Sequence, residues 1–452
     1  MAQPPNLLFL FPDQWRGDWI GCAGNDIPVK TPNIDRLASY GTRFPNARTN
    51  SPLCAPARAA LATGNCYPAA GVAGGHDDLA RDTPTIFARL RDAGYSVATC
   101  GKNDLRKGAY MRSAPGAGDW LAALGFTQIR EHAGKRDAAV MAIENRPDPY
   151  VQFLRENNAI DAYLGDIAAR DILRTQERKV SAVAHRLPRT LYTDDFCGRN
   201  ALGLIAALPR TTPWFLWVNF PGPHEPFDPP DELLKSYAGT RFPDPVAPDP
   251  ADPSDHQAVR RAYAAMMEGI DQWIGRIIGA VAERGELDRT IVVFSSDHGE
   301  MLGDHGKWGK AVAQEGSLRI PLVIAGPGLR RGIVSPALAE LADIGATLLD
   351  AAGIAPLEDA PENARARSLL PMLSGRVPET RHRSHQYAAL GDWRAVMHEQ
   401  YKAVRWADGR VALYDLAADP GELADVAAAR PAIAGALGQW LAQYPGTVAD
   451  GV

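Results

Sequence analysis

The sequence shows no excess of charge of either sign. Its 452 residues include 48 lysines and arginines against 53 aspartates and glutamates, which gives a formal net charge of −5. Nucleic-acid-binding proteins and proteins that bind anionic membranes need a basic surface, so this balance argues against both classes of partner. Any affinity for an anion must therefore be local.

The chain also lacks a recognisable targeting segment and a disulfide framework. It begins MAQPPNLLFLFPDQW, which has no basic region, and the apolar stretch is too short for a signal peptide or a membrane span. The five cysteines are scattered and odd in number, a poor disulfide framework for a chain of this size. We therefore expect a cytoplasmic protein whose cysteines other than Cys54 are reduced.

Hydrophobic patterns predict an α/β fold with a sizeable core. Residues 6–11, 214–220 and 290–294 are continuous apolar runs, typical of parallel strands buried on both faces. Residues 259–282 carry apolar side chains at three- and four-residue steps, which predicts an amphipathic helix.

The pattern changes after residue 375. Alternating segments at 393–397 and 401–406 predict an antiparallel hairpin, and residues 431–444 predict a closing helix. We therefore expect a main domain at residues 1–375, which holds the candidate catalytic residues, and a small α+β subdomain at residues 376–452. Residues 243–255 are rich in proline and aspartate and predict a surface loop with no packing surface of its own.

Polar side chains follow two of the predicted strands. Asp13 and Gln14 come after the first, and Asp297 and His298 come after the last. The alternative for any one of these residues is that it caps a helix. Four of them at two strand ends favour a ligand-binding site, because ligands bind at this edge of open α/β sheets. Oxygen ligands suit calcium, whereas the imidazole and the neutral amide favour manganese, iron or zinc. These residue types alone do not determine which metal ion the site would bind.

Residues 54–64, CAPARAALATG, place Cys54, Pro56 and Arg58 in the pattern Cys-x-Pro-x-Arg. This run resembles the sulfatase signature, in which a dedicated enzyme oxidises the cysteine to formylglycine. The alternative is a buried structural cysteine before a helix. The flanking residues up to Gly64 also match the sulfatase pattern and favour the functional interpretation. The resemblance implies a hydrated aldehyde that attacks sulfur with one hydroxyl and expels sulfate with the help of the other.

The resemblance extends over most of the chain. Residues 295–310, SSDHGEMLGDHGKWGK, are similar to the sulfatase segment that supplies two metal ligands and a sulfate-binding lysine, here Lys310. The chain thus resembles formylglycine-dependent sulfatases of the alkaline phosphatase superfamily. This implies an α/β sandwich with a large mixed central sheet flanked by helices, and a smaller C-terminal domain with a short antiparallel sheet.

The same resemblance implies a role for each matching residue. The implied metal ligands are Asp13, Gln14, Cys54 as formylglycine, Asp297 and His298. The implied catalytic residues are Cys54, Arg58, Lys102, His224 and Lys310. The implied substrate-binding residues are Lys102, Asp104, His224 and Lys310.

The implied cofactor is one divalent metal. The family as a whole indicates Ca²⁺. Manganese or another transition metal is the alternative, because the phosphonate monoester hydrolase relatives carry Asp-Gln at the first strand, as Asp13 and Gln14 do here.

Asp104 departs from the family pattern. Residues 101–105, Gly-Lys-Asn-Asp-Leu, stand where sulfatases usually carry Gly-Lys-x-His-Leu, so Lys102 fits but Asp104 replaces a histidine. A carboxylate facing an anionic ester would repel it unless a cation compensates. Asp104 therefore either binds a polar or cationic group of the leaving alcohol or forms a salt bridge with Lys102.

His224, in a His-x-Pro context, matches the histidine that sulfatases use for the departing oxygen. An unshifted imidazole pKa of about 6.5 would suit a general acid near neutrality. The alternative is a surface-loop histidine. Five further polar residues are interpreted as solvated surface: His76, Asp77, Asp78, Lys135 and Arg136.

These patterns together predict a sulfatase that hydrolyses a sulfate monoester to an alcohol and inorganic sulfate. The alternatives are a phosphonate monoester or phosphodiester hydrolase that uses the same site, and a catalytically silent protein that binds sugar sulfates. The expected partners are a small-molecule or saccharide sulfate ester and the formylglycine-generating enzyme, with no nucleic acid and no membrane. The sequence predicts neither the alcohol part of the substrate nor the oligomeric state.

Overall fold

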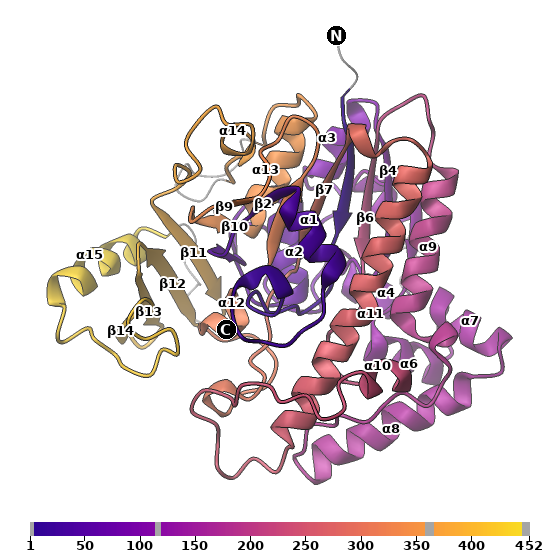
Figure 1. The fold of residues 1–452 in the computed structure, drawn as a ribbon, viewed down its shortest axis with the longest axis horizontal. Helices are drawn as coiled ribbons and strands as arrows, with labels where there is room; N and C mark the ends of the chain where they lie inside the picture. The colour runs from indigo at the N-terminus through magenta and orange to yellow at the C-terminus, as the bar shows by residue number, and fades with distance from the viewer. Residues whose placement is uncertain (1–3, 114–118, 358–365, 445–452) are drawn as a thin grey trace.

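The computed structural model describes residues 4–113, 119–357 and 366–444 and has a mixed sheet at its centre (Figure 1). In the described residues the sheet has eight strands in the order β5-β4-β6-β1-β7-β8-β2-β9. Their bounds, in that order, are Gln128–Glu131, Ser96–Gly101, Trp214–Asn219, Asn6–Leu10, Thr290–Ser295, Leu322–Ala325, Gly41–Arg43 and Ile333–Val334.

The five strands from β5 to β7 are parallel, and β8 is antiparallel to both of its neighbours. In the register of the central strands, Leu8 lies between Leu216 and Val292. All three predicted strands are present, and every residue of β1, β6 and β7 is buried. The predicted mixed α/β sheet is thereby confirmed.

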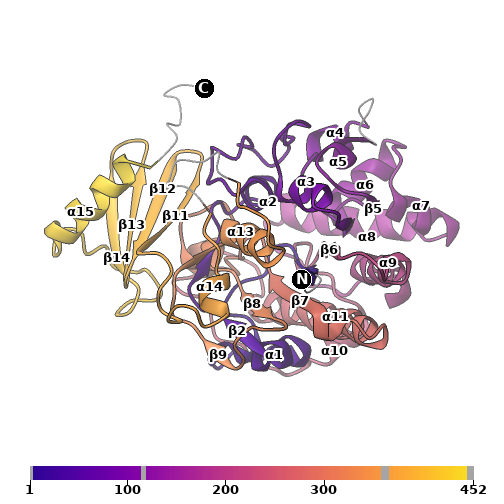
Figure 2. The same ribbon diagram turned by 90° about the horizontal axis from the view of Figure 1, so that it is seen from above.

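Helices cover both faces of the sheet, as Figure 2 shows from above. One face packs against α1 (Pro32–Ser39), α9 (Thr193–Ala207) and α11 (His256–Glu283). The other packs against α2 (Cys54–Thr63), α3 (Ile86–Asp92) and α13 (Leu341–Ala351). The helix predicted at 259–282 is α11, and its buried stripe follows the expected spacing.

Smaller elements complete the main domain. A separate apolar cluster joins α6 (Lys135–Ile143), α7 (Pro149–Glu156) and α8 (Ile160–Gln176). The remaining helices are α4 (Lys107–Met111), α5 (Trp120–Ala123), α10 (Asp231–Lys235), α12 (Glu315–Leu318) and α14 (Leu370–Leu373). Two short strands, β3 (Ala47–Arg48) and β10 (Ala339–Glu340), pair in parallel.

The C-terminal part forms a four-stranded antiparallel sheet of β11 (His385–Leu390), β12 (Trp393–His398), β13 (Tyr401–Trp406) and β14 (Val411–Asp415). The predicted hairpin is β12 and β13. The closing helix α15 (Pro431–Ala442) ends two residues earlier than predicted. All these elements follow residue 376, whereas the exact boundary at 375/376 stays a prediction.

Buried charges join the C-terminal sheet to the main domain. The Lys402 ammonium on β13 is fully buried, donates to the carbonyl of Ala313 at 2.6 Å and pairs with Glu315 at 3.4 Å and with Glu422. Glu315 also pairs with Arg48 of β3 at 2.8 Å. Since burial removes the solvation of each charge, these groups depend on one another.

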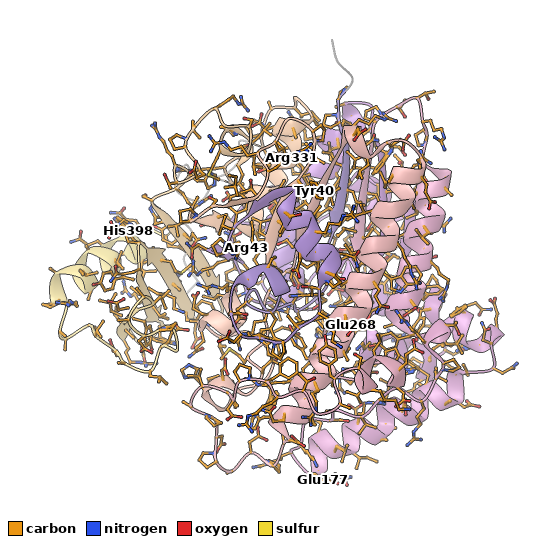
Figure 3. All side chains as sticks on the ribbon, in the orientation of Figure 1. Tyr40, Arg43, Glu177, Glu268, Arg331 and His398 are labelled. Atoms are coloured by element: carbon orange, nitrogen blue, oxygen red, sulfur yellow. The ribbon has the colours of Figure 1, made fainter. Side chains whose placement is uncertain are left out.

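A cavity of about 770 Å³ lies at the edge of the sheet where β7 begins and β8 ends. Tyr40 and Arg331, which Figure 3 labels, are among the residues that line it. This edge is opposite to the one where Asp13 and Asp297 follow their strands. Among the described residues, no helix combines the length and the apolar character that crossing a membrane needs.

Replacement of Lys402 tests the joint between the two parts. We expect Lys402→Ala to lower the free energy of unfolding by about 3 to 5 kcal/mol, because it removes the cation that pairs with buried Glu422 and one of the cations that pair with Glu315. Guanidinium denaturation followed by circular dichroism measures this. The matched control is Lys235→Ala, which removes a solvent-exposed pair with Asp231 and should leave the midpoint unchanged. Equal effects of the two variants would contradict the structural role of Lys402.

Candidate active site

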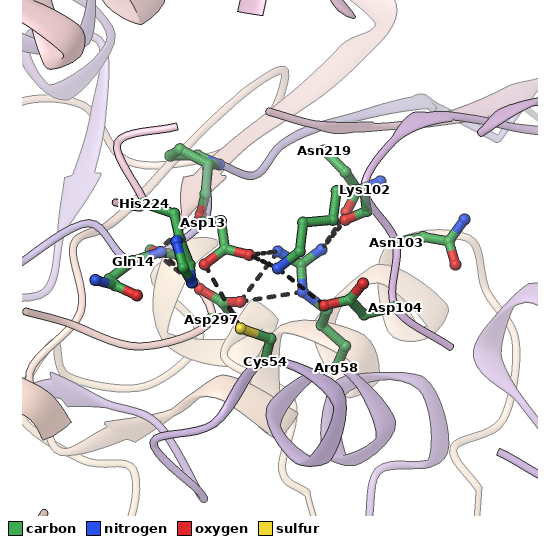
Figure 4. Close-up of polar contacts among 12 residues, drawn as sticks. Asp13, Gln14, Cys54, Arg58, Lys102, Asn103, Asp104, Asn219, His224 and Asp297 are labelled. Carbon is green, nitrogen blue, oxygen red and sulfur yellow. Dashed lines mark hydrogen bonds and ion pairs between the residues drawn. The ribbon is translucent and has the colours of Figure 1, made fainter. Parts of the chain in front are cut away.

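The predicted site residues gather at the carboxyl edge of the parallel strands, as Figure 4 shows. Asp13 and Gln14 follow β1, Asp297 and His298 follow β7, Lys102 to Asp104 follow β4, and His224 lies on the loop after β6. Cys54 opens α2, which reaches the same place from the face of the sheet. The structure therefore brings together residues that are up to 297 positions apart in the sequence.

Cys54 is the first residue of α2, a helix whose small alanine side chains allow close packing and whose residues are all buried. The helix ends at Gly64, which adopts a left-handed conformation with φ of 70°. The Cys54 Sγ atom lies 3.0 Å from the Lys310 ammonium and 3.3 Å from His298 Nε2. Burial and Asp13 act to raise the pKa of the Cys54 thiol, but Lys102, Lys310 and His298 outweigh them and lower it to about 5. The positive charges around position 54 therefore favour an anionic group there.

Two fully buried carboxylates, Asp13 and Asp297, share the guanidinium of Arg58. Arg58 Nη2 lies 3.3 Å from Asp13 Oδ2 and 3.0 Å from Asp297 Oδ2. Burial acts to raise the pKa of Asp13, but Lys102, Lys310 and Arg58 hold it well below its usual range. Asp13 is therefore available as an anionic ligand. Arg58 contacts these carboxylates and sits on the same face of α2 as Cys54, four residues away.

His298 presents one ring nitrogen to the same cluster. Its Nδ1 lies 3.0 Å from the carbonyl oxygen of Gly299, an acceptor only, so Nδ1 carries the proton and Nε2 faces Cys54 and the carboxylates. Burial acts to lower the pKa of His298, but Asp297 raises it above its usual value. Asp297 therefore favours positive charge at the ring of His298, whereas Lys310 opposes it.

Gln14 completes this side of the site. Its backbone N–H donates to Asp297 Oδ1 at 2.9 Å, and its side-chain oxygen accepts a hydrogen bond from Lys310 at 2.7 Å. The side-chain nitrogen of Gln14 donates to Glu300, a fully buried carboxylate. Lys310 therefore lies between Gln14 and Cys54.

Lys102 and Asp104 form a buried pair. Lys102 contacts Asp13 Oδ2 and lies 2.9 Å from Asp104 Oδ2, while Lys107 lies 3.9 Å from the same Asp104 atom. Burial acts to raise the pKa of Asp104, but Lys102 and Lys107 hold it well below its usual range. Of the two alternatives for Asp104, the salt bridge with Lys102 is present.

His224 lies on the proline-rich loop after β6 and is partly buried. Its Nδ1 is 2.7 Å from the carbonyl oxygen of Glu225, so Nδ1 donates and Nε2 remains an acceptor in the neutral ring. Burial and Lys310 lower the pKa of His224 to about 3. The unshifted value of about 6.5 expected from the sequence is therefore wrong, because the neighbouring lysine and the loss of solvent disfavour the imidazolium.

Two expectations about loops are also wrong. Lys135 is not on the solvated surface: it is buried at the start of α6, pairs with Asp228 at 2.6 Å and donates to the carbonyl of Pro226, beneath the loop that carries His224. The loop at residues 243–255 does pack. The N–H of Val246 donates to Asp304, and Asp252 accepts the indole N–H of Trp308, so this loop braces the segment that leads to Lys310.

Sequence reasoning assigned no role to two residues that the structure places at the site, Asn219 and Glu300. Asn219 ends β6, is fully buried and accepts a hydrogen bond from Arg58 Nη1 at 2.9 Å. Its position at a strand end was a usable signal. Glu300 belongs to the Asp-His-Gly-Glu run. Its partner Gln14 is 286 residues away in the sequence, so no local pattern indicated this contact.

The donor set fits a divalent cation. One atom each from Asp13, Cys54, Asp297 and His298 lies within 4.8 Å of the other three, and all four residues are buried. Two carboxylates and an imidazole nitrogen form a binding site for such an ion. Gln14 Oε1 accepts from Lys310, which also lies 3.0 Å from Cys54 Sγ. The residues present are therefore compatible with a metal centre.

Comparisons with known proteins agree with this geometry. The sulfatase family pattern matches residues 5–354, and the C-terminal pattern of N-sulphoglucosamine sulphohydrolase matches residues 303–437. An arylsulfatase from Clostridium perfringens is 29% identical, over 93% of this chain and 90% of its own. A choline-sulfatase from Rhizobium meliloti is 29% identical, over 94% and 82%.

Among solved structures, the phosphonate monoester hydrolase of Agrobacterium radiobacter superposes with a TM-score of 0.79 and 25% identity, over 97% of this chain and 95% of that one. The family match covers most of the chain, including Asp13, Cys54 and Asp297. The chain therefore belongs to the sulfatase family, in the alkaline phosphatase superfamily, and is an enzyme of the sulfatase class.

Proposed function

We propose that the protein hydrolyses a sulfate monoester to an alcohol and inorganic sulfate, with Cys54 converted to formylglycine. One observation carries this proposal. The atom at position 54 that the modification would replace lies 3.0 Å from Lys310 and 3.3 Å from His298, and 3.7 Å from Asp13. The nucleophile would therefore sit where the anion-binding cations and the metal ligands meet.

The formylglycine would supply a hydrated aldehyde. One of its hydroxyls would attack sulfur, and loss of the proton from the other would expel inorganic sulfate and regenerate the aldehyde. Lys310 and Lys102 hold the negative charge of the ester, and Arg58 keeps Asp13 and Asp297 in place. Each preorganised donor of this kind contributes about 3 to 4 kcal/mol to transition-state stabilisation. Asp297 is placed to accept the proton of the attacking hydroxyl.

His224 serves the leaving oxygen only when it is protonated. Because Nδ1 is bound to the carbonyl of Glu225, Nε2 must carry the second proton in order to donate. Lys310 disfavours that imidazolium in the free protein. An anionic ester next to Lys310 would offset this repulsion, so binding of the substrate favours the acid form of His224.

We propose one divalent metal, held by Asp13, Gln14, the modified Cys54, Asp297 and His298. When bound, it would neutralise the nonbridging oxygens of the ester and lower the pKa of the nucleophile. The family resemblance favours calcium. The imidazole of His298 and the amide of Gln14 support manganese or another transition metal as the alternative.

The second candidate is a phosphonate monoester or phosphodiester hydrolase. Gln14 and the superposition on the Agrobacterium radiobacter phosphonate monoester hydrolase favour it. A catalytically silent sugar-sulfate binding protein is less well supported, because Asp13, Asp297 and His298 are all competent ligands.

The proposed substrate is a small-molecule or saccharide sulfate ester. The choline-sulfatase and arylsulfatase similarities support a sulfate ester without selecting the alcohol. Maturation by a formylglycine-generating enzyme and a cytoplasmic location are further parts of the proposal. The location is supported by the five cysteines, which are scattered and odd in number and therefore form a poor disulfide framework.

The nucleophile and the reaction can be tested together. In protein made with the formylglycine-generating enzyme, we expect the peptide that contains Cys54 to carry an aldehyde, detected by mass spectrometry. This protein should hydrolyse 4-nitrophenyl sulfate with a higher kcat/KM than 4-nitrophenyl phenylphosphonate, and Cys54→Ala should reduce both to background. Turnover by a preparation whose Cys54 is entirely an alkylatable thiol would show that the nucleophile is wrong, and a preference for the phosphonate ester would favour the second candidate.

Chelation tests the metal. We expect prolonged treatment with a chelator to abolish turnover and one equivalent of a divalent ion to restore it, because the ion balances the buried carboxylates of Asp13 and Asp297. Elemental analysis of protein purified without added metal distinguishes calcium from a transition metal. Full activity in a sample shown to be metal-free would remove the ion from the mechanism.

Asp104→Asn tests whether Asp104 braces Lys102. We expect kcat/KM to fall about 10- to 150-fold, which corresponds to about 1.5 to 3 kcal/mol for a charge-assisted contact. The loss should be equal for 4-nitrophenyl sulfate and for choline sulfate, since both present the sulfate that Lys102 contacts. The matched control is Asp137→Asn, which removes the ion pair of Asp137 with Lys107 at 2.9 Å but leaves Asp104 and Lys102 in place. We expect this variant to keep the wild-type kcat/KM. A loss confined to choline sulfate would instead assign Asp104 to recognition of the alcohol.

A further inference from the structure

Glu300 is a fully buried carboxylate next to the proposed metal centre. In the described part of the chain, its two oxygens accept hydrogen bonds from neutral N–H donors. A buried carboxylate costs free energy unless hydrogen bonds or cations compensate it. The hydrogen bonds of Glu300 must therefore compensate for the burial of its carboxylate.

The two oxygens of Glu300 connect two parts of the site. Oε1 accepts hydrogen bonds from the backbone N–H groups of Leu302, at 3.0 Å, and Gly309, at 2.6 Å. Oε2 accepts the side-chain N–H of Gln14. Gly309 immediately precedes Lys310 in the chain, so one carboxylate holds both the amide after β1 and the turn that carries the anion-binding lysine.

This arrangement decides which end of the Gln14 amide faces Lys310. An amide has a donor end and an acceptor end. With Nε2 bound to Glu300, Oε1 accepts from the Lys310 ammonium at 2.7 Å. The reversed amide would set its N–H groups against the ammonium and its oxygen against the carboxylate, and both contacts are repulsive.

We propose that Glu300 is a positioning residue that presents the oxygen of Gln14, rather than its nitrogen, to the cationic side of the site and fixes the turn before Lys310. This inference rests on the metal centre proposed above for Asp13, Gln14, Asp297 and His298. It also accounts for the neutral residue at position 14. A carboxylate there would lie against Glu300, and two adjacent buried carboxylates repel each other.

The pair can be tested by exchanging its members. In Glu300→Gln, the new amide still accepts from Leu302 and Gly309 through its oxygen, but its nitrogen meets the nitrogen of Gln14. Adding Gln14→Glu restores a matched donor and acceptor between the two positions. The two substitutions should therefore compensate each other.

The measurement is the dissociation constant for Mn²⁺, obtained by calorimetric titration of metal-free protein. We expect Glu300→Gln to weaken Mn²⁺ binding by about 10- to 100-fold, the usual cost of removing a group that orients a metal ligand. Gln14→Glu adds a charge and can itself strengthen binding. It should improve affinity at least about 10-fold more in the Glu300→Gln background than in the wild type.

The matched control is Glu340→Gln. Glu340 is also buried and accepts a backbone N–H, from Tyr387 at 2.8 Å, and an amide N–H, from Asn50 at 2.9 Å. It differs in pairing with Arg383 at 3.0 Å and in lying at the joint with the C-terminal sheet. This variant should lower the Tm and leave the Mn²⁺ dissociation constant unchanged. It thereby separates loss of stability from loss of ligand positioning.

Unchanged Mn²⁺ affinity in Glu300→Gln, or equal effects of Gln14→Glu in both backgrounds, would overturn the positioning role while leaving the proposed function intact. Failure of the wild type to bind either Mn²⁺ or Ca²⁺ would instead overturn the metal centre, and the positioning role with it. If Glu300→Gln does not fold, recovery of a folded protein on adding Gln14→Glu supports the pair, and failure of the double variant contradicts it.

Discussion

The structure depends on the burial of two carboxylates side by side. Asp13 and Asp297 follow the adjacent strands β1 and β7, and neither is exposed to solvent. Such groups repel each other and lose their hydration, so they remain ionised only where fixed cations surround them. Arg58 supplies charge to both, and Lys102 contacts Asp13. The ends of two strands are thereby tied to the start of α2 and to the end of β4.

That requirement also determines where the proposed nucleophile, residue 54, lies. Arg58 can reach both carboxylates only if the first turn of α2 points at the sheet edge, and this places Cys54 at the same point. Arg58 further donates to Asn219 at the end of β6 and to the carbonyl of Lys102. One side chain therefore connects four strands with the helix that carries Cys54. Loss of a partner from such a network costs about 3 to 5 kcal/mol, so the chemistry and the stability of the protein share the same contacts.

The features that sequence predicted are those that consecutive residues encode. Continuous apolar runs identified β1, β6 and β7, and polar residues directly after them identified Asp13 and Asp297. The role of Asp104 was narrowed to two alternatives because Lys102 lies only two residues before it in the sequence. In contrast, the burial of Lys135 against Asp228 and the contact of Gln14 with Glu300 join residues 93 and 286 positions apart. The lowered pKa of His224 depends on Lys310. No local pattern reports such contacts, because they exist only once the sheet has brought the strand ends together.

The central claim is that these buried carboxylates form a metal centre at position 54. The most direct test is anomalous diffraction from crystals of the modified protein grown with Mn²⁺, recorded above and below the manganese absorption edge. A single anomalous peak in contact with Asp13, Asp297 and His298, adjacent to the formylglycine, is the result that this account predicts. Crystals of the active enzyme that show no anomalous peak at this site would contradict it.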